Sequence, residues 1–202
     1  MAEAVRTNKK KGSGSRTRSI AFVGLTIALI AVASWITVPL GPIPFTLQMF
    51  AISFAIIVLS PSECIAAIAG YLVLGAIGVP VFAGMSGGVG SLMGTTGGFL
   101  WGFLPGAAAG SLFLYVVRDK MGRRTKADKL NGWQDLALGI VAGLIFTAIS
   151  YVCGWAQYMA VANVGPLASF SVTIAPFVVV DVLKIVAAAL VARAVRAAVP
   201  NL

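Results

Sequence analysis

Six apolar runs, most of them long enough to cross a bilayer, are the feature that most constrains this chain. A transmembrane helix needs about 20 mostly apolar residues. The runs cover residues 19–38, 45–59, 64–79, 98–117, 133–161 and 172–198. Only 10% of the residues are charged, whereas a soluble domain has about 25% and needs them to cover its surface. We therefore expect an all-α integral membrane protein, a single bundle of six transmembrane helices.

The charges predict the orientation of this bundle. The loops at 39–44, 80–97 and 162–171 carry no charge, and 14 of the 15 basic residues lie in the N-terminal segment, between the fourth and fifth runs, or near the C-terminus. Since basic residues accumulate on the cytoplasmic side, both termini are expected in the cytoplasm. The net charge of +9 therefore reflects membrane topology and does not indicate nucleic-acid binding.

Three segments are expected along the chain. Residues 1–18 form a basic, flexible cytoplasmic tail, because Gly12-Ser13-Gly14-Ser15 interrupts the run of lysines and arginines. Residues 19–198 form the membrane domain, and residues 199–202 are a short C-terminal tail. We expect a multi-pass membrane protein.

Asp181 and Lys184 are the two charged residues that fall well inside an apolar run. A charge near the bilayer centre costs about 2.5–3.5 kcal/mol on insertion scales, so such residues face the protein interior or a wet cavity. Their i, i+3 spacing places both on one helix face. The pair is either an ion pair that locks two helices together or a ligand site in which a carboxylate accepts N–H bonds beside an ammonium donor.

Two more polar residues are candidates for the same site. Gln48 begins the second run and offers both a donor and an acceptor, or it lies among the lipid headgroups. Tyr151 belongs either to an interfacial aromatic belt with Trp155 and Tyr158 or, because it lies deeper, to a cavity wall.

Glycines have two expected roles. Gly98, Gly102, Gly106 and Gly110 recur at every fourth residue and predict close helix packing. The uncharged loop at 84–91, which contains Gly87 and Gly88, is either a connector or a lid whose backbone approaches a ligand.

A stripe of small residues in the first run, Ala21, Gly24, Ala28 and Ala31, suits either a partner helix or packing within the bundle.

Several reaction classes are excluded by absences in the sequence. The chain has no histidine and two cysteines, which argues against a metal site, a catalytic triad or a disulfide framework. No glycine-rich run ends in Gly-Lys-Ser/Thr, so the chain is not its own ATPase. We expect neither an enzyme nor a bound cofactor.

An ordered set of segments resembles one family, the biotin-specific substrate-binding subunits (BioY, the S-component) of energy-coupling factor transporters. The matching segments are residues 42–48, 70–82, 87–88, 94–103 and 181–184. The resemblance implies a six-helix bundle with a biotin cavity near its outer side, high-affinity binding of biotin as the transported ligand, and assembly with a transmembrane coupling protein and two ABC-type ATPases.

The resemblance also implies roles for particular residues. Asp181 and Lys184 match the family's Asp-x-x-Lys and would bind biotin, together with Gln48, Tyr151, Gly87 and Gly88. Gly24 and Ala28, with Ala21 beside them, would dock on the coupling protein. A family asparagine near the glycine-rich loop has no counterpart between Val81 and Trp101, which leaves that contact to backbone groups or Gln48.

The alternative function is a stand-alone, proton-coupled secondary transporter of a small vitamin-like solute, with Asp181 carrying the proton. Inverted repeats would favour it, and none is visible between residues 19–110 and 111–202.

Overall fold

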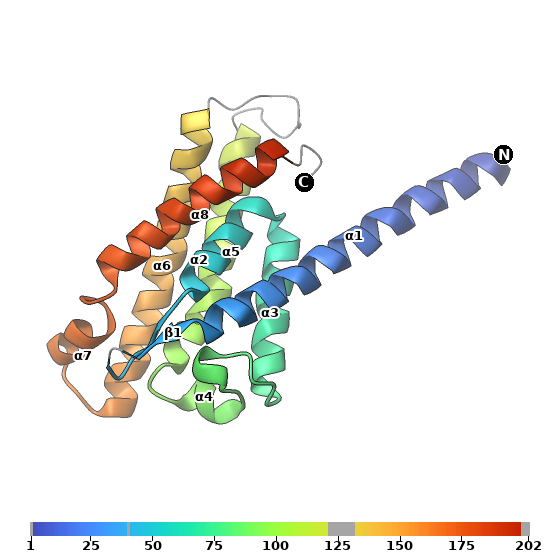
Figure 1. Ribbon diagram of the computed structural model, residues 1–202. Helices are drawn as coiled ribbons and strands as arrows, with labels where there is room; N and C mark the ends of the chain where they lie inside the picture. Colours follow the sequence, from blue (N-terminus) through green and yellow to red (C-terminus); the bar gives the residue numbers. More distant parts are fainter. Residues whose placement is uncertain (1, 40, 121–131, 199–202) are drawn as a thin grey trace.

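A helical bundle is capped at one end by a small hairpin and short helices in the computed structural model, which describes residues 2–39, 41–120 and 132–198 (Figure 1). The long helices are α1 (Ala2–Trp35), α5 (Gly97–Lys120), α6 (Gly132–Ala162) and α8 (Val178–Ala198). Shorter elements are β1 (Thr37–Val38), β2 (Phe45–Thr46), α2 (Gln48–Val58), α3 (Pro61–Ala76), η1 (Ala83–Met85), α4 (Val89–Met93) and α7 (Pro166–Thr173). The C-terminal end of α8 lies toward the end of the bundle opposite α4 and α7, and the N-terminal part of α1 projects away from the bundle (Figure 1).

Not every predicted run forms a helix long enough to cross a bilayer. Within the described residues, Arg16–Trp35, Gly97–Lys120 and Trp133–Ala162 are long and apolar enough, and α7 with α8 adds a fourth span if this pair, bent by 44°, counts as one. At about 1.5 Å per residue, α2 and α3 reach only about 16 and 24 Å, against a hydrocarbon core of about 30 Å. The structure therefore supports a multi-pass helical membrane fold with three to four candidate spans.

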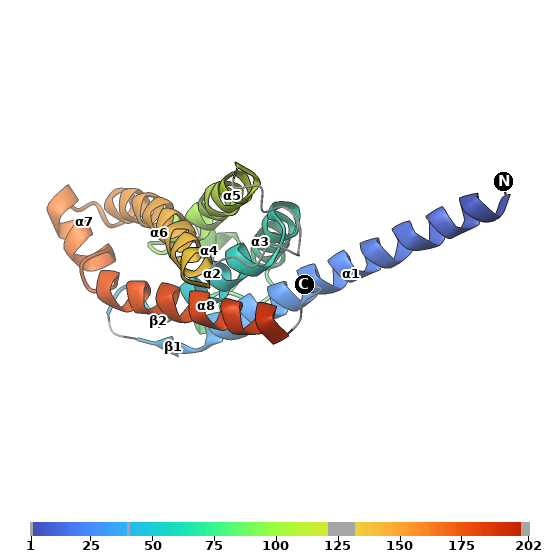
Figure 2. The ribbon, with the colours of Figure 1, turned by 90° about the horizontal axis from the view of Figure 1, so that it is seen from above.

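Two segments differ from the sequence prediction. Residues 2–18, expected as a flexible tail, continue α1, which projects beyond the bundle (Figure 2). No proline interrupts 2–35, and the glycines lower helix propensity without ending the helix. Residues 166–173, expected partly as a loop, form α7, because Pro166 supplies the fixed φ favoured at the first helical position.

A capping box begins α3. Ser60 accepts a hydrogen bond from the backbone N–H of Glu63, and the Glu63 carboxylate accepts one from the backbone N–H of Ser60. This capping box, followed by Pro61, begins the helix directly after α2 ends.

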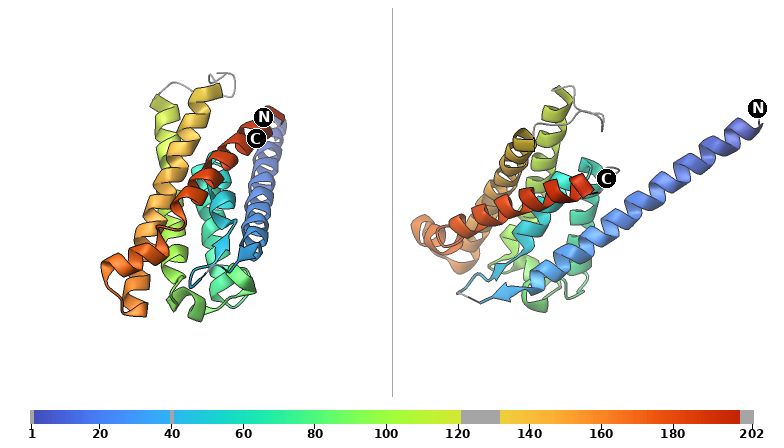
Figure 3. Two further views of the ribbon diagram at one scale, coloured as in Figure 1. Left: turned by 60° about the vertical axis from the view of Figure 1, so that its left-hand side comes forward. Right: turned by 45° about the horizontal axis from the view of Figure 1, so that its top comes forward.

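Glycines bring α5 and α6 together, as the four-residue repeat predicted. A Cβ added at Gly102 would lie 2.7 Å from the Cα of Ser150, and one added at Gly106 would lie 2.8 Å from the carbonyl oxygen of Phe146. Gly98 and Gly110 meet the α6 backbone in the same way. The two helices lie side by side in every view (Figure 3).

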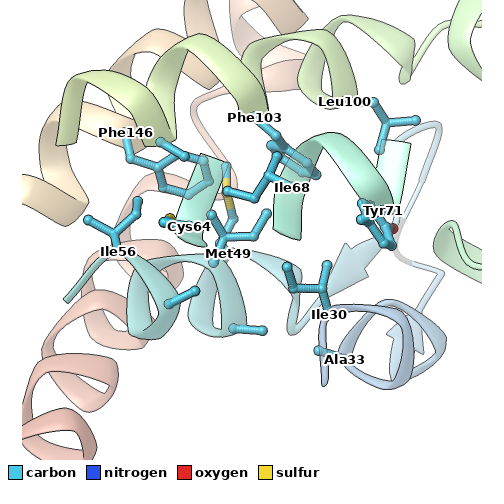
Figure 4. Packing of buried hydrophobic residues seen from close by; sticks show 14 of the residues in the cluster. Ile30, Ala33, Met49, Ile56, Cys64, Ile68, Tyr71, Leu100, Phe103 and Phe146 are labelled. Carbon is cyan, nitrogen blue, oxygen red and sulfur yellow. The ribbon is translucent and has the colours of Figure 1, made fainter. Parts of the chain in front are cut away.

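The apolar core lies where α1, α2, α3, α5 and α6 meet. Met49 from α2 and Cys64 and Ile68 from α3 point into a common interior with Phe103 and Phe146 (Figure 4). This core holds α3 and α5 against the short α2. It thereby fixes the start of α2, where Gln48 is placed.

Candidate functional site

The Asp181–Lys184 pair lies in the first two turns of α8, next to the hairpin end of the bundle. Lys184 Nζ lies 2.8 Å from Asp181 Oδ1, and the side chains are 12% and 5% exposed. The predicted i, i+3 pair therefore forms, with Asp181 buried and Lys184 partly buried. Such burial requires further partners, because a desolvated charge is costly unless its hydrogen-bonding capacity is used.

Tyr151 supplies one of these partners from α6. Its hydroxyl donates to Asp181 Oδ2 at 2.7 Å, so each carboxylate oxygen has one protein donor. The ring of Phe99 meets Tyr151 edge-on with centroids 6.2 Å apart. Tyr151 is buried and is thus part of a cavity wall, which decides against the interfacial belt.

The β1–β2 hairpin is joined to α8 at the same place. Lys184 Nζ donates to the carbonyl oxygen of Thr46 at 2.7 Å. Phe45 stacks on Phe177 with centroids 4.4 Å apart, and Lys184 Nζ lies 5.3 Å from the Phe45 ring centre. The ammonium therefore ties two segments 138 residues apart and still borders the cavity.

Gln48 is buried at the first residue of α2, which excludes the headgroup position. Its Nε2 donates to the hydroxyl of Tyr71, and that hydroxyl donates to the carbonyl oxygen of Val81 at 2.9 Å. Thr46 Oγ1 donates to Gln48 Oε1 at 3.2 Å. This chain of bonds fixes the orientation of the Gln48 amide at the cavity that Lys184 also lines.

One cavity of about 130 Å³ at the hairpin end of the bundle is lined by Asp181, Lys184, Tyr151 and Gln48. Its remaining polar lining comes from the hydroxyl-bearing residues Thr46, Ser86, Ser91 and Thr96. Its apolar walls are Ile43, Pro44, Met49, Phe82, Ala83, Phe99, Leu100, Phe103 and Phe177. One charged pair and a few directed polar groups in an apolar cavity are typical of a site for a small organic molecule.

Gly87 and Gly88, to which the resemblance gives a role in biotin binding, are not among the residues that line this cavity. A Cβ at Gly87 would lie 2.5 Å from the carbonyl oxygen of Val79. Gly88 has a φ of +87°, and its backbone N–H donates to the carbonyl oxygen of Gly75. Both glycines shape the turn before α4. The neighbouring serines, Ser86 and Ser91, reach the cavity instead.

The sequence did not predict four further residues that line the cavity: Thr46, Thr96, Phe99 and Phe177. Hydroxyls in membrane proteins usually bond their own helix, so single serines and threonines gave no signal. The positions of some hydroxyl-bearing residues could have indicated that they line the site. Thr46 precedes Gln48 by two residues, and Ser86 and Ser91 lie on either side of the glycine pair.

The small-residue stripe of α1 faces outward. Ala21, Gly24 and Ala28 are exposed, and a Cβ at Gly24 would meet nothing within 4 Å. Ala31 is buried, so the stripe ends at Ala28. The alternative of packing inside the bundle is therefore wrong for these three residues.

No cluster of three or more histidine, cysteine, aspartate or glutamate side chains suited to a metal ion occurs in residues 2–39, 41–120 and 132–198.

Comparison with known proteins places this geometry in context. A family model described as the BioY family matches residues 6–201. A biotin transporter BioY from Thermotoga maritima is 36% identical over 87% of this chain and 94% of its own length. A biotin transporter BioY from Rhodobacter capsulatus is 34% identical over 88% of this chain and 93% of its own length.

A solved structure has the same fold. The crystal structure of the S-component for biotin from an ECF-type ABC transporter superposes with a TM-score of 0.77 and covers 91% of this chain and 93% of its own. At 22% identity, this likeness concerns the fold alone.

Proposed function

Because the chain belongs to the BioY family, we propose that it is the biotin-binding membrane subunit of an energy-coupling factor (ABC-type) vitamin uptake transporter. The family comprises transporters rather than enzymes, in agreement with the prediction that this chain is not an enzyme. The observation that carries the proposal is the hydrogen-bonded cluster of buried Asp181 and Tyr151 with partly buried Lys184 at the wall of an apolar cavity.

The chemistry of biotin suits this cluster. Its ureido ring has two N–H donors and one carbonyl acceptor, and its thiophane ring and valeryl chain are apolar. A carboxylate oxygen accepts two hydrogen bonds, so Asp181 can accept from the ureido group while it keeps Tyr151 and Lys184. The Lys184 ammonium has a third proton for either the ureido oxygen or the valerate carboxylate. Phe99 and Phe177 would cover the apolar part.

Gln48 would complete the ligand contacts. Its amide is held beside the cavity by Tyr71 and Thr46 and can take over a contact that an asparagine makes elsewhere in the family.

The proposed topology has six membrane-embedded helices, α1, α2, α3, α5, α6 and α8, with both termini in the cytoplasm. Arg16, Arg18, Arg118, Lys120 and Arg196 support this orientation, because they lie toward the helix ends opposite the uncharged hairpin, α4 and α7. The cavity would then open to the outside of a prokaryotic plasma membrane. The shorter α2 and α3 would cross by packing against longer neighbours.

The proposed partners are a transmembrane coupling protein and two ABC-type ATPases. Ala21, Gly24 and Ala28 form an exposed, smooth surface on α1 that a partner helix can approach closely.

Calorimetric titration of biotin into the detergent-purified subunit tests the proposal. Asp181→Asn and Lys184→Met each remove a charge-assisted bond, which at about 1.5–3 kcal/mol predicts a loss of about tenfold or more in affinity. Asp135→Asn is the matched control, because Asp135 is also ion-paired, 2.7 Å from Arg118, but lies near the other end of the bundle. Affinity should be retained in this control.

Three results would contradict the proposal in different ways. Absence of biotin binding by the wild type refutes the identification of biotin as the ligand. Tight binding that survives both substitutions makes the pair a structural lock and places the ligand elsewhere. Uptake into liposomes by the subunit alone, driven by a pH gradient, would favour the proton-coupled alternative.

A further inference from the structure

A single side chain of α6 holds α4 in place next to the cavity. Gln157 Nε2 donates to the carbonyl oxygens of Leu92 and Gly94, both at 2.8 Å, across more than sixty residues of sequence. Trp101 Nε1 donates to the same Leu92 oxygen at 3.1 Å. The C-terminal end of α4 is therefore fixed by side chains from α5 and α6.

α4 needs such an anchor because it is only five residues long. The last four carbonyls of any helix lack partners within that helix, and one this short does not persist without outside contacts. Its N-terminal cap, Gly88, contributes no side-chain bond. The amide of Gln157 satisfies two carbonyls at once, which a side chain without two N–H groups cannot do.

Glycines at the start of α5 make room for this amide. A Cβ at Gly97 would lie 2.6 Å from Gln157 Nε2 and even closer to the carbonyl oxygen of Leu92. A Cβ at Gly98 would lie 2.7 Å from Gln157 Cβ. The glycine pair thus lets α4, α5 and α6 converge on one polar side chain within an otherwise apolar region.

The anchored segment contributes to the cavity. Ser91 precedes Leu92, and Thr96 follows Gly94, and both line the cavity. Tyr151, which bonds Asp181, lies on α6 six residues before Gln157. α6 therefore connects the Asp181 side of the cavity with the hydroxyl-bearing side.

We propose that Gln157 is a positioning residue for ligand binding: it holds residues 91–96 so that the hydroxyls of Ser91 and Thr96 contact the ligand in the cavity. This proposal rests on the proposed binding of biotin. Gln157 itself does not line the cavity, and its effect passes through the α4 segment.

Gln157→Met tests the proposal, because methionine keeps the length of the side chain and removes both donors. We expect biotin affinity to fall about tenfold, mostly through faster dissociation, since two neutral hydrogen bonds that order the segment are lost. Gln134→Met makes the same change on the same helix, near its other end, and should leave affinity unchanged.

A double-mutant cycle separates positioning from a general loss of packing. The variant Ser91→Ala/Thr96→Val should itself weaken biotin binding, and in that background Gln157→Met should have a clearly smaller effect than in the wild type. Additive effects, or no effect of the two hydroxyl substitutions, would overturn the proposal.

Hydrogen exchange of the ligand-free subunit gives a readout that does not depend on biotin. In Gln157→Met the amides of residues 88–97 should exchange at least tenfold faster, while those of α8 keep their wild-type rates. Unchanged hydrogen exchange of the amides at 88–97 would overturn the inference that Gln157 holds α4 in place. Wild-type protein that fails to bind biotin refutes the proposed function and this proposal with it, whereas normal binding by Gln157→Met refutes only the positioning role.

Discussion

Replacement of Gly102 by alanine tests how tightly α5 and α6 are packed. The added Cβ would lie 2.7 Å from the Cα of Ser150 and 3.1 Å from the Cβ of Cys153. Carbon atoms in contact prefer a separation of about 3.5–4.0 Å, so the helices must move apart by about 0.8 Å at this point. The nearest obstacle is backbone, which cannot rotate away as a flexible side chain would.

The expected change in the free energy of unfolding of Gly102→Ala is the sum of two opposing effects. Overpacking of a dense interface costs about 1–3 kcal/mol. Alanine in place of glycine within a helix stabilises the folded state by about 0.5–1 kcal/mol. The net destabilisation is about 1 kcal/mol, which for a chain of this size lowers Tm by about 2–4 °C.

Gly24→Ala is the matched control, because a Cβ at Gly24 meets nothing within 4 Å. Only the gain in helix propensity applies there, so Tm should stay unchanged or rise. Thermal unfolding of the purified subunit in one detergent, at one scan rate, compares both variants with the wild type. A Tm for Gly102→Ala at or above that of the wild type would refute the close packing inferred for α5 and α6.

Two further predictions concern the site and its partner surface. Tyr71→Phe leaves Gln48 Nε2 without its present acceptor, while the Val81 carbonyl keeps the hydrogen bond from the hydroxyl of Ser34, and an unsatisfied buried polar group costs about 1–3 kcal/mol; we expect a lower Tm and weaker biotin binding, and calorimetric affinity equal to wild type would argue against a role for Gln48. Gly24→Leu fills the exposed stripe of α1 without touching the cavity. It should therefore abolish ATP-dependent biotin uptake by the reconstituted transporter while the isolated subunit still binds biotin, and full uptake would exclude this stripe as the docking surface.

Apolar composition and a regular spacing of small residues are local properties, so the sequence predicted the features that depend on them. The helical membrane class and the glycine contacts between α5 and α6 depend on apolar composition and on a simple periodicity. The short α2 and α3 and the bend before α8 were not predictable from hydropathy, because helix ends are decided by contacts with other segments.

The candidate site also combines features that the sequence predicts with features that depend on the tertiary structure. The sequence by itself determined that Asp181 and Lys184 share a helix face and must be buried, because charged residues within an apolar run have few other places to go. Only the tertiary structure brought Tyr151 to Asp181 and the Thr46 carbonyl to Lys184, since these contacts join segments 30 and 138 residues apart. It also excluded Gly87 and Gly88 from the cavity and brought in Ser91 and Thr96, because the direction of a loop residue depends on what the loop packs against.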